Sequence, residues 1–159
     1  MRVLTYEEKV RLFGDPKPIP RGEGGFADLD EEFLKNIQYF DFPVLGRLRF
    51  HSKVFHQLFE ALKTIEERGL SKEIDIELTR RRGGTFIPRY QRWSPQYPLS
   101  SHAFGIAIDL FSVNSEGKIE KTKWSEEFVE VFEKNGFFWG GRFKNFYDPI
   151  HFEVCKILI

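Results

Sequence analysis

The stretch FGIAIDLF, residues 104–111, constrains the fold more than any other because it presents two different faces. Its large aliphatic residues alternate with the two-residue period of a β-strand that has one side in the core: Ile106, Ile108 and Leu110. The opposite side holds two very small side chains followed by a carboxylate: Gly105, Ala107 and Asp109. The pattern predicts a sheet strand with free space beside Asp109, where something could bind.

Four further segments show clear periodicity. Residues 52–69 place apolar side chains on one stripe, which predicts a helix that begins at its capping serine and ends at its glycine. Residues 73–79, EIDIELT, alternate apolar and polar side chains and predict a half-buried strand. Residues 125–136 predict a second short helix, and residues 150–157 predict a last strand.

The first fifty residues show the least regular pattern. Residues 14–25, GDPKPIPRGEGG, are rich in proline and glycine, which predicts an irregular loop on the surface. We therefore expect residues 1–50 to form an irregular N-terminal arm, packed on the core of one domain that spans residues 1–159. The short alternating segments predict an α+β fold with a mainly antiparallel sheet flanked by helices.

The composition excludes several classes of protein. A chain of 159 residues can bury about two thirds of its unfolded surface, so it needs neither a disulfide nor a metal merely to fold. Its 24 basic and 24 acidic residues cancel, so we expect neither nucleic acid nor an anionic membrane as a partner. The single cysteine, Cys155, excludes an internal disulfide framework, so any metal site would use histidine and carboxylate ligands.

The sequence also bears on where the protein is made. The N-terminus lacks the apolar run of a signal peptide, and no segment approaches the roughly 20 apolar residues that cross a bilayer. We therefore expect synthesis in the cytoplasm, and a separate route of release if the protein acts outside the cell.

Histidine and aspartate residues in the second half of the chain form a candidate metal site. His102 and Asp109 lie seven positions apart, so a loop must deliver the histidine while the strand delivers the aspartate. With His151, they supply two imidazoles and one carboxylate, a typical ligand set of catalytic zinc. A buried histidine satisfied by hydrogen bonds is the other interpretation of these residue types. His51 and His56 cannot bind one ion from the same helix face, and we treat both as structural.

Asp148 lies three residues before His151 and directly before Pro149, so it should stand on the turn that enters the last strand. Zinc lowers the pKa of its bound water to about 7, and a nearby carboxylate can take the proton and pass it to a leaving amine. A zinc-bound water together with the Asp148 carboxylate would then have the groups needed for hydrolysis. The alternative is that Asp148 merely stabilises the turn, as aspartate often does before proline.

Two motifs resemble those of a known enzyme family. SSHAFGIAID contains the pattern S-x-H-x-x-G-x-A-x-D, DPIHFE matches D/E-x-x-H-F/W-E, and FFWGG lies between them. Together they resemble the zinc peptidases that cut D-amino-acid bonds of bacterial cell-wall peptides. These are the D-alanyl-D-alanine carboxypeptidases, the vancomycin-resistance dipeptidases and the phage L-alanyl-D-glutamate endolysin peptidases, which have the hedgehog/DD-peptidase fold. The resemblance extends from about residue 51 to residue 152.

This resemblance implies roles for individual residues. One zinc ion would be held by His102, Asp109 and His151. Asp148 would be the general base, at a position where many relatives have glutamate and the endolysin branch has aspartate. The family also uses an arginine before the first motif to hold the scissile carbonyl and its oxyanion. Of the arginines in TRRRGGTFIPRYQRW, the resemblance favours Arg89, which follows a Gly-Gly-aromatic stretch.

Supporting roles are expected for four more residues. Ser100 should hydrogen-bond near the metal loop, and Glu153 shares a strand face with His151 and could accept a hydrogen bond from a ligand imidazole. Trp139 and Gly140 could form one wall of the cleft, where glycine lets a peptide approach closely. Ordinary turn residues are the alternative for Ser100, Trp139 and Gly140.

The resemblance thus implies a zinc-dependent peptidase that hydrolyses peptide bonds of peptidoglycan stem peptides, its expected partner. It leaves open whether the enzyme is a D-Ala-D-Ala carboxypeptidase or an L-Ala-D-Glu endopeptidase. The alternative is a non-catalytic, zinc-containing binding module of the hedgehog-like fold, against which the presence of Asp148 argues. We expect a monomer that would have to be released from the cytoplasm to reach intact cell wall.

Overall fold

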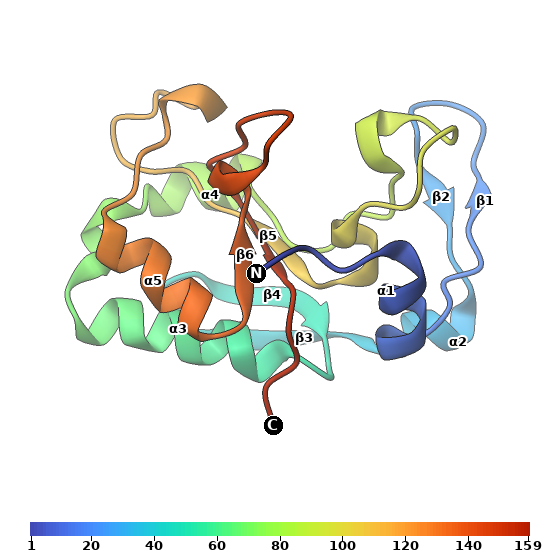
Figure 1. Cartoon of the computed structure of the whole chain (residues 1–159), viewed down its shortest axis with the longest axis horizontal. Coiled ribbons are helices and arrows are strands. Elements are labelled where there is room, and N and C mark those ends of the chain that lie inside the picture. The colour runs from blue at the N-terminus through green and yellow to red at the C-terminus, as the bar shows by residue number, and fades with distance from the viewer.

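The computed structural model describes residues 1–159 and has a mixed α+β architecture with three small antiparallel sheets, as the sequence predicts (Figure 1). The largest sheet has the order β5-β7-β6, with β7 (His151–Val154) between β5 (Ala107–Asp109) and β6 (Phe137–Trp139). Strands β3 (Ile37–Phe42) and β4 (Gly46–His51) form a hairpin. The expected antiparallel sheet is therefore divided into separate small pieces.

Five α-helices surround these sheets: α1 (Tyr6–Phe13), α2 (Glu31–Leu34), α3 (Phe55–Glu67), α4 (Ile76–Arg82) and α5 (Glu126–Lys134). Helices α3 and α5 lie side by side at one end of the molecule, and α1 and α2 lie at the other (Figure 1). None of these helices has the length and apolar character needed to cross a membrane.

The core of the domain confirms the alternation predicted for residues 104–111. The three aliphatic side chains of that segment are at most 1 % exposed: Ile106, Ile108 and Leu110. Helix α5 packs on the sheet through phenylalanines, and the ring centroids of Phe132 and Phe152 lie 4.4 Å apart. Because burial of one phenylalanine contributes about 1.5–3 kcal/mol, this contact holds β7 firmly against α5.

Both predicted helices form, with different starts. In α5 the Ser125 hydroxyl accepts a hydrogen bond from the Phe128 amide at 3.2 Å, which is the predicted N-cap. Helix α3 begins only at Phe55, after a turn in which the Val54 amide donates to the His51 carbonyl. The prediction that Ser52 caps this helix was therefore wrong.

The strand predicted for residues 73–79 is also wrong, because the chain turns into α4 there. The Asp75 carboxylate accepts a hydrogen bond from the Leu78 amide at 3.0 Å and caps the helix. Only Ile74 keeps a strand contact, an isolated bridge to Ser112. The basic run of residues 80–82 then forms the last turn of a helix, where its charge is favourable beside the helix C-terminus.

The first fifty residues are more regular than their composition suggests. Helix α1 has a complete capping box, in which Thr5 and Glu8 each accept a hydrogen bond from the other's backbone amide. The hairpin of β3 and β4 follows. Residues 14–25 contain only β1 (Ile19–Pro20), which pairs with β2 (Ala27–Asp28). One hydrophobic cluster includes side chains from α1 and from the C-terminal sheet.

Candidate metal centre

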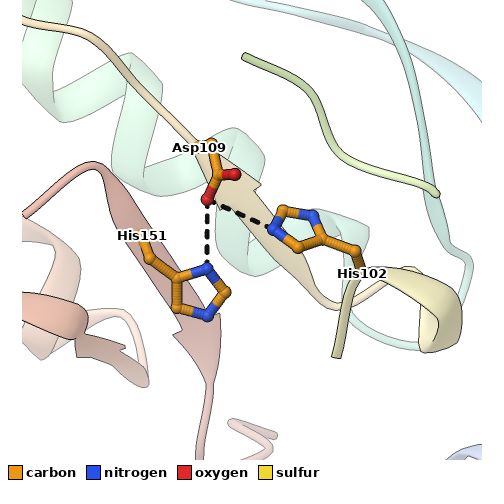
Figure 2. A group of neighbouring side chains, drawn as sticks. All are labelled: His102, Asp109 and His151. Atoms are coloured by element: carbon orange, nitrogen blue, oxygen red, sulfur yellow. Dashed lines mark hydrogen bonds and ion pairs between the residues drawn. The ribbon is translucent and has the colours of Figure 1, made fainter. Parts of the chain in front are cut away.

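Three polar side chains converge where β5, β7 and the 3₁₀ turn Ser101–Phe104 meet (Figure 2). His102 comes from the turn, and Asp109 and His151 are cross-strand neighbours on β5 and β7. One potential ligand atom from each residue lies within 4.8 Å of the other two. The structure therefore brings together the three predicted metal ligands.

Gly105 explains how His102 can return to Asp109 over seven residues. It ends the 3₁₀ turn in the left-handed conformation, with φ of +70°. A Cβ atom there would lie 2.5 Å from Ile37 Cδ1 and 3.1 Å from the His51 amide nitrogen. Because glycine alone has neither this steric conflict nor a penalty for positive φ, it lets the chain reverse between the two ligands.

The His102 ring is oriented by its backbone surroundings. Its Nδ1–H donates to the Thr85 carbonyl at 2.8 Å, which leaves Nε2 as the nitrogen with a free lone pair. Nε2 lies 3.2 Å from Asp109 Oδ1, is buried, and has no hydrogen-bond partner. The Ser100 hydroxyl accepts from the His102 amide at 3.1 Å, so Ser100 lies at the metal loop, as expected, and fixes the turn.

The His151 ring is held in the same manner on the opposite side. Its Nε2 pairs with Glu153 Oε1 at 2.9 Å, and its Nδ1 lies 3.0 Å from Asp109 Oδ1 (Figure 2). Glu153 is buried, and its other oxygen accepts a hydrogen bond from the Ser101 hydroxyl at 2.8 Å. Glu153 thus has the contact with a ligand imidazole that its place on the strand suggested.

This donor set fits a metal ion. With Nδ1 of His102 and Nε2 of His151 engaged elsewhere, the two remaining ring nitrogens face the same carboxylate oxygen of Asp109. Lone pairs that converge in this way need a cation between them, either protons or a metal. Outer partners that fix the tautomer of each histidine are also typical of metal sites.

The close contacts in this cluster shift the pKa values of His151 and Asp109. Burial opposes a charge on His151, but hydrogen bonds with Asp109 and Glu153 outweigh it and raise the pKa of His151 to about 10. Burial also opposes ionisation of Asp109, yet the two imidazoles hold the pKa of that carboxyl below its usual range. A metal would therefore have to displace a proton from this cluster.

A cavity of about 520 Å³ adjoins the cluster and includes His151 and Asp148 in its lining. Asp148 stands on the turn before β7, where its carbonyl accepts a hydrogen bond from the His151 amide. Burial raises the pKa of Asp148, while the His151 and Arg89 charges oppose that rise. The predicted base is thus a half-buried carboxyl at the edge of a cavity beside a candidate ligand.

Arg89 lines the same cavity, as its expected role requires. Its Nη1 donates to the Tyr90 carbonyl at 3.1 Å, and its guanidinium lies 4.7 Å from the centroid of the Trp93 ring. Burial lowers the pKa of Arg89, and the charges of Asp109 and Asp148 raise it. Arg92 also lines the cavity, whereas residues 80–82 do not.

Trp139 and Gly140 do not line this cavity and instead contact the turn that carries Asp148. The Trp139 indole donates to the Pro149 carbonyl at 2.9 Å, and the Trp124 indole donates to the same oxygen at 2.8 Å. A Cβ on Gly140 would collide with the Asp148 carbonyl. Both residues therefore pack against the turn that carries Asp148 and lie outside the lining of this cavity.

The remaining histidines and the cysteine have no contact with this site. His51 is buried, and its Nε2 pairs with the Phe13 carbonyl at 2.9 Å. His56 Nε2 pairs with the Leu158 carbonyl at 3.2 Å. Cys155 is half-buried, and its thiol donates to the Gly136 carbonyl.

The segment that carries this cluster is similar to a known family. A family model described as D-alanyl-D-alanine carboxypeptidase matches residues 94–154. Residues 94–154 are therefore similar to the D-alanyl-D-alanine carboxypeptidase family. The match contains all three ligand candidates and Asp148, in agreement with the resemblance seen in the sequence. Thr85, which contacts His102, and Arg89, which lines the adjoining cavity, lie before the matched segment, so the candidate site also includes the preceding part of the chain.

Proposed function

We propose that the protein is a zinc-dependent peptidase that hydrolyses D-amino-acid-containing bonds of peptidoglycan stem peptides. One observation carries the proposal: His102 and His151 each engage one ring nitrogen elsewhere and turn the other toward Asp109. The site lies beside a cavity that holds a further carboxyl and an arginine, and the family match supports the substrate class.

His102, Asp109 and His151 would hold the metal. When bound there, zinc supplies a Lewis acid that polarises the scissile carbonyl and makes water acidic enough to react near neutral pH. The protein contributes the orientation of the ligands. Glu153 and the Thr85 carbonyl fix the histidine tautomers, so neither ring has to reorient when the metal enters.

Asp148 is suited to move the proton. It stands on the turn that leads into His151, and its carboxyl lines the cavity. As a carboxylate it takes a proton from the attacking water, and as a carboxylic acid it returns that proton to the amine that leaves. The two indole donors on Pro149 and the close packing of Gly140 keep this side chain in place.

Arg89 is suited to stabilise negative charge on the carbonyl oxygen. Its guanidinium rests against Trp93 and lines the cavity with Asp148. A fixed donor of this kind contributes about 3–4 kcal/mol to a transition state with a developing oxyanion. Its Nε is buried without a hydrogen-bond partner, so the side chain retains donor capacity for a ligand.

A direct test is mass spectrometry of peptidoglycan stem peptides after incubation with the zinc-loaded protein. Loss of one terminal alanine, the reaction that the description of the family model favours, identifies a carboxypeptidase; a cut between L-alanine and D-glutamate identifies an endopeptidase. Asp148→Asn is the matched control, since it keeps the shape of the side chain and removes the base. We expect this variant to retain the metal and to lose about 100- to 10,000-fold in turnover.

A non-catalytic binding module is the second candidate, because the metal ligands alone do not require turnover. The position of Asp148 and Arg89 in the cavity favours the enzyme. Wild-type protein that holds zinc and binds stem peptides without cutting them would establish the binding module instead.

A further inference from the structure

Lys9 on α1 is a buried lysine for which the proposed reaction has no use. It is 5 % exposed, although lysine is almost never fully buried unless it is paired. It lies four residues before Phe13, so the two buried residues of α1 share one helix face. Phe13 packs into the hydrophobic core, so the fold fixes the position of the helix and of Lys9.

The ammonium group of Lys9 has a charged neighbour and no hydrogen bond to it. Its Nζ lies 3.9 Å from Glu153 Oε2, which is beyond hydrogen-bond distance. Both oxygens of Glu153 are already engaged, one by His151 and the other by Ser101. An ammonium has three N–H donors, and here the protein supplies no acceptor for them at hydrogen-bond distance.

Lys9 is part of the lining of the cavity beside the candidate metal centre. Lys9 lines it together with Asp148 and His151, and Val3 and Leu4 from the same end of the chain line it as well. Two more cations line the cavity, and each guanidinium stacks on an aromatic ring instead of a carboxylate: Arg89 on Trp93 and Arg92 on Tyr97. The cavity therefore offers cationic donors to an anionic ligand.

We propose that Lys9 binds a carboxylate of the peptide substrate and makes the enzyme selective for it. The proposal rests on the proposed peptidase function and adds a recognition residue from outside the family match. Stem peptides carry carboxylates at the C-terminus and on side chains, and both offer the same chemistry to an ammonium. A charge-assisted hydrogen bond in a site shielded from water is strong enough to discriminate a carboxylate from a carboxamide.

The test compares wild type with Lys9→Met, which keeps the length of the side chain and removes its charge. Arg11→Met is the matched control, because Arg11 is exposed on the same helix. The substrates are a stem pentapeptide, its C-terminal carboxamide, and a version with glutamine in place of glutamate. KM and kcat are measured for each, with zinc content and thermal unfolding as checks on the protein.

We expect Lys9→Met to raise KM for the pentapeptide about 10- to 100-fold, the range for one hydrogen bond to a charged group. KM for one of the two amides should stay unchanged, and that amide identifies the carboxylate that Lys9 binds. Lys9→Arg should restore part of the preference, and Arg11→Met should behave as wild type. Zinc content should be the same in all variants.

Two results would overturn the proposal. If Lys9→Met loses zinc, or lowers kcat equally on all three peptides, Lys9 acts through Glu153 and His151 and does not bind the substrate. If acid and amide peptides respond equally, no carboxylate is recognised. Should wild type cut none of them, the peptidase function fails, and calorimetric binding of the same peptides to zinc-loaded wild type and Lys9→Met still decides whether Lys9 selects a carboxylate.

Discussion

Gly105 links two of the candidate metal ligands, His102 and Asp109, so Gly105→Ala tests whether backbone geometry builds the candidate site. Alanine would have to adopt φ of +70°, which costs about 1–2 kcal/mol. Its Cβ would also lie 2.5 Å from Ile37 Cδ1 and 3.1 Å from the His51 amide nitrogen. Overpacking of this kind costs about 1–3 kcal/mol, so we expect a total loss of about 2–5 kcal/mol in the free energy of unfolding.

Gly69 provides a matched control. It has the same φ of +70°, and a Cβ added there would meet nothing within 4 Å. Gly69→Ala should therefore cost only the conformational part, about 1–2 kcal/mol. The difference between the two variants isolates the contacts of Gly105, and urea unfolding of both proteins measures it.

A second variant identifies the colliding atom. Ile37→Val removes Cδ1 of Ile37, so the double variant Ile37→Val/Gly105→Ala should be more stable than the sum of the two single changes implies. Zinc affinity should fall in Gly105→Ala and remain at the wild-type level in Gly69→Ala, because only Gly105 lies between His102 and Asp109. Equal losses of stability and of zinc affinity in both variants would refute the reasoning.

Three further predictions concern other parts of the site and fold. His102→Ala should abolish stoichiometric zinc binding, measured by elemental analysis, because it removes a nitrogen directed at Asp109. Trp139→Phe should cost about 0.5–1.5 kcal/mol of stability and lower kcat with zinc content unchanged, because one donor to the carbonyl before the last strand is lost. His51 should make the free energy of unfolding depend on pH. Burial lowers its pKa in the folded protein below the unfolded value of about 6.5. The stabilisation from neutral His51 is therefore complete above that value and is lost as pH falls below it. Urea unfolding at pH 7.5 and 5.5 should show a smaller difference in His51→Gln than in wild type.

Controls for these predictions come from neighbouring residues. His56→Ala should keep zinc, because His56 is exposed and is not part of the candidate metal cluster. Trp124→Phe should resemble the Trp139 variant, since both indoles donate to the same oxygen, and the double change should cost more than either alone. Full activity in that double variant would show that the two indoles do not position Asp148.

In the C-terminal half of the candidate site, the sequence signals are local. The alternation around Asp109 and the place of Glu153 two residues after His151 both follow from the strand period, and the structure agrees with each. Residues 73–79 do not follow the strand period. The helix that forms buries Leu78 and leaves Ile76 exposed, so the alternation does not describe it. The capping aspartate instead marks its start by accepting a hydrogen bond from the Leu78 amide.

For other parts of the candidate site, no local sequence pattern could have predicted the contacts. Thr85 contributes only its backbone carbonyl, which any residue could provide, so its type says nothing about His102. Lys9 lies 144 positions from Glu153 in the sequence, and only the packing of α1 brings its charge to the cavity. Trp139 was expected in a wall of the cleft, and its indole donates instead to the Pro149 carbonyl, which also accepts a hydrogen bond from Trp124.

Glu153 contacts residues from three separate parts of the chain around the candidate metal centre. One of its oxygens pairs with His151, a candidate metal ligand. The other accepts a hydrogen bond from the Ser101 hydroxyl, on the turn that carries His102, and lies near the charge of Lys9 on α1. A buried carboxylate is costly unless its partners compensate it, so each partner stabilises the position of the others. The residues matched by the family model include the three candidate ligands, while Lys9, Thr85 and Arg89 come from the part of the chain before them. The metal centre therefore depends on the fold of the whole domain, and loosening α1 should weaken the orientation of His151 even though no ligand is changed.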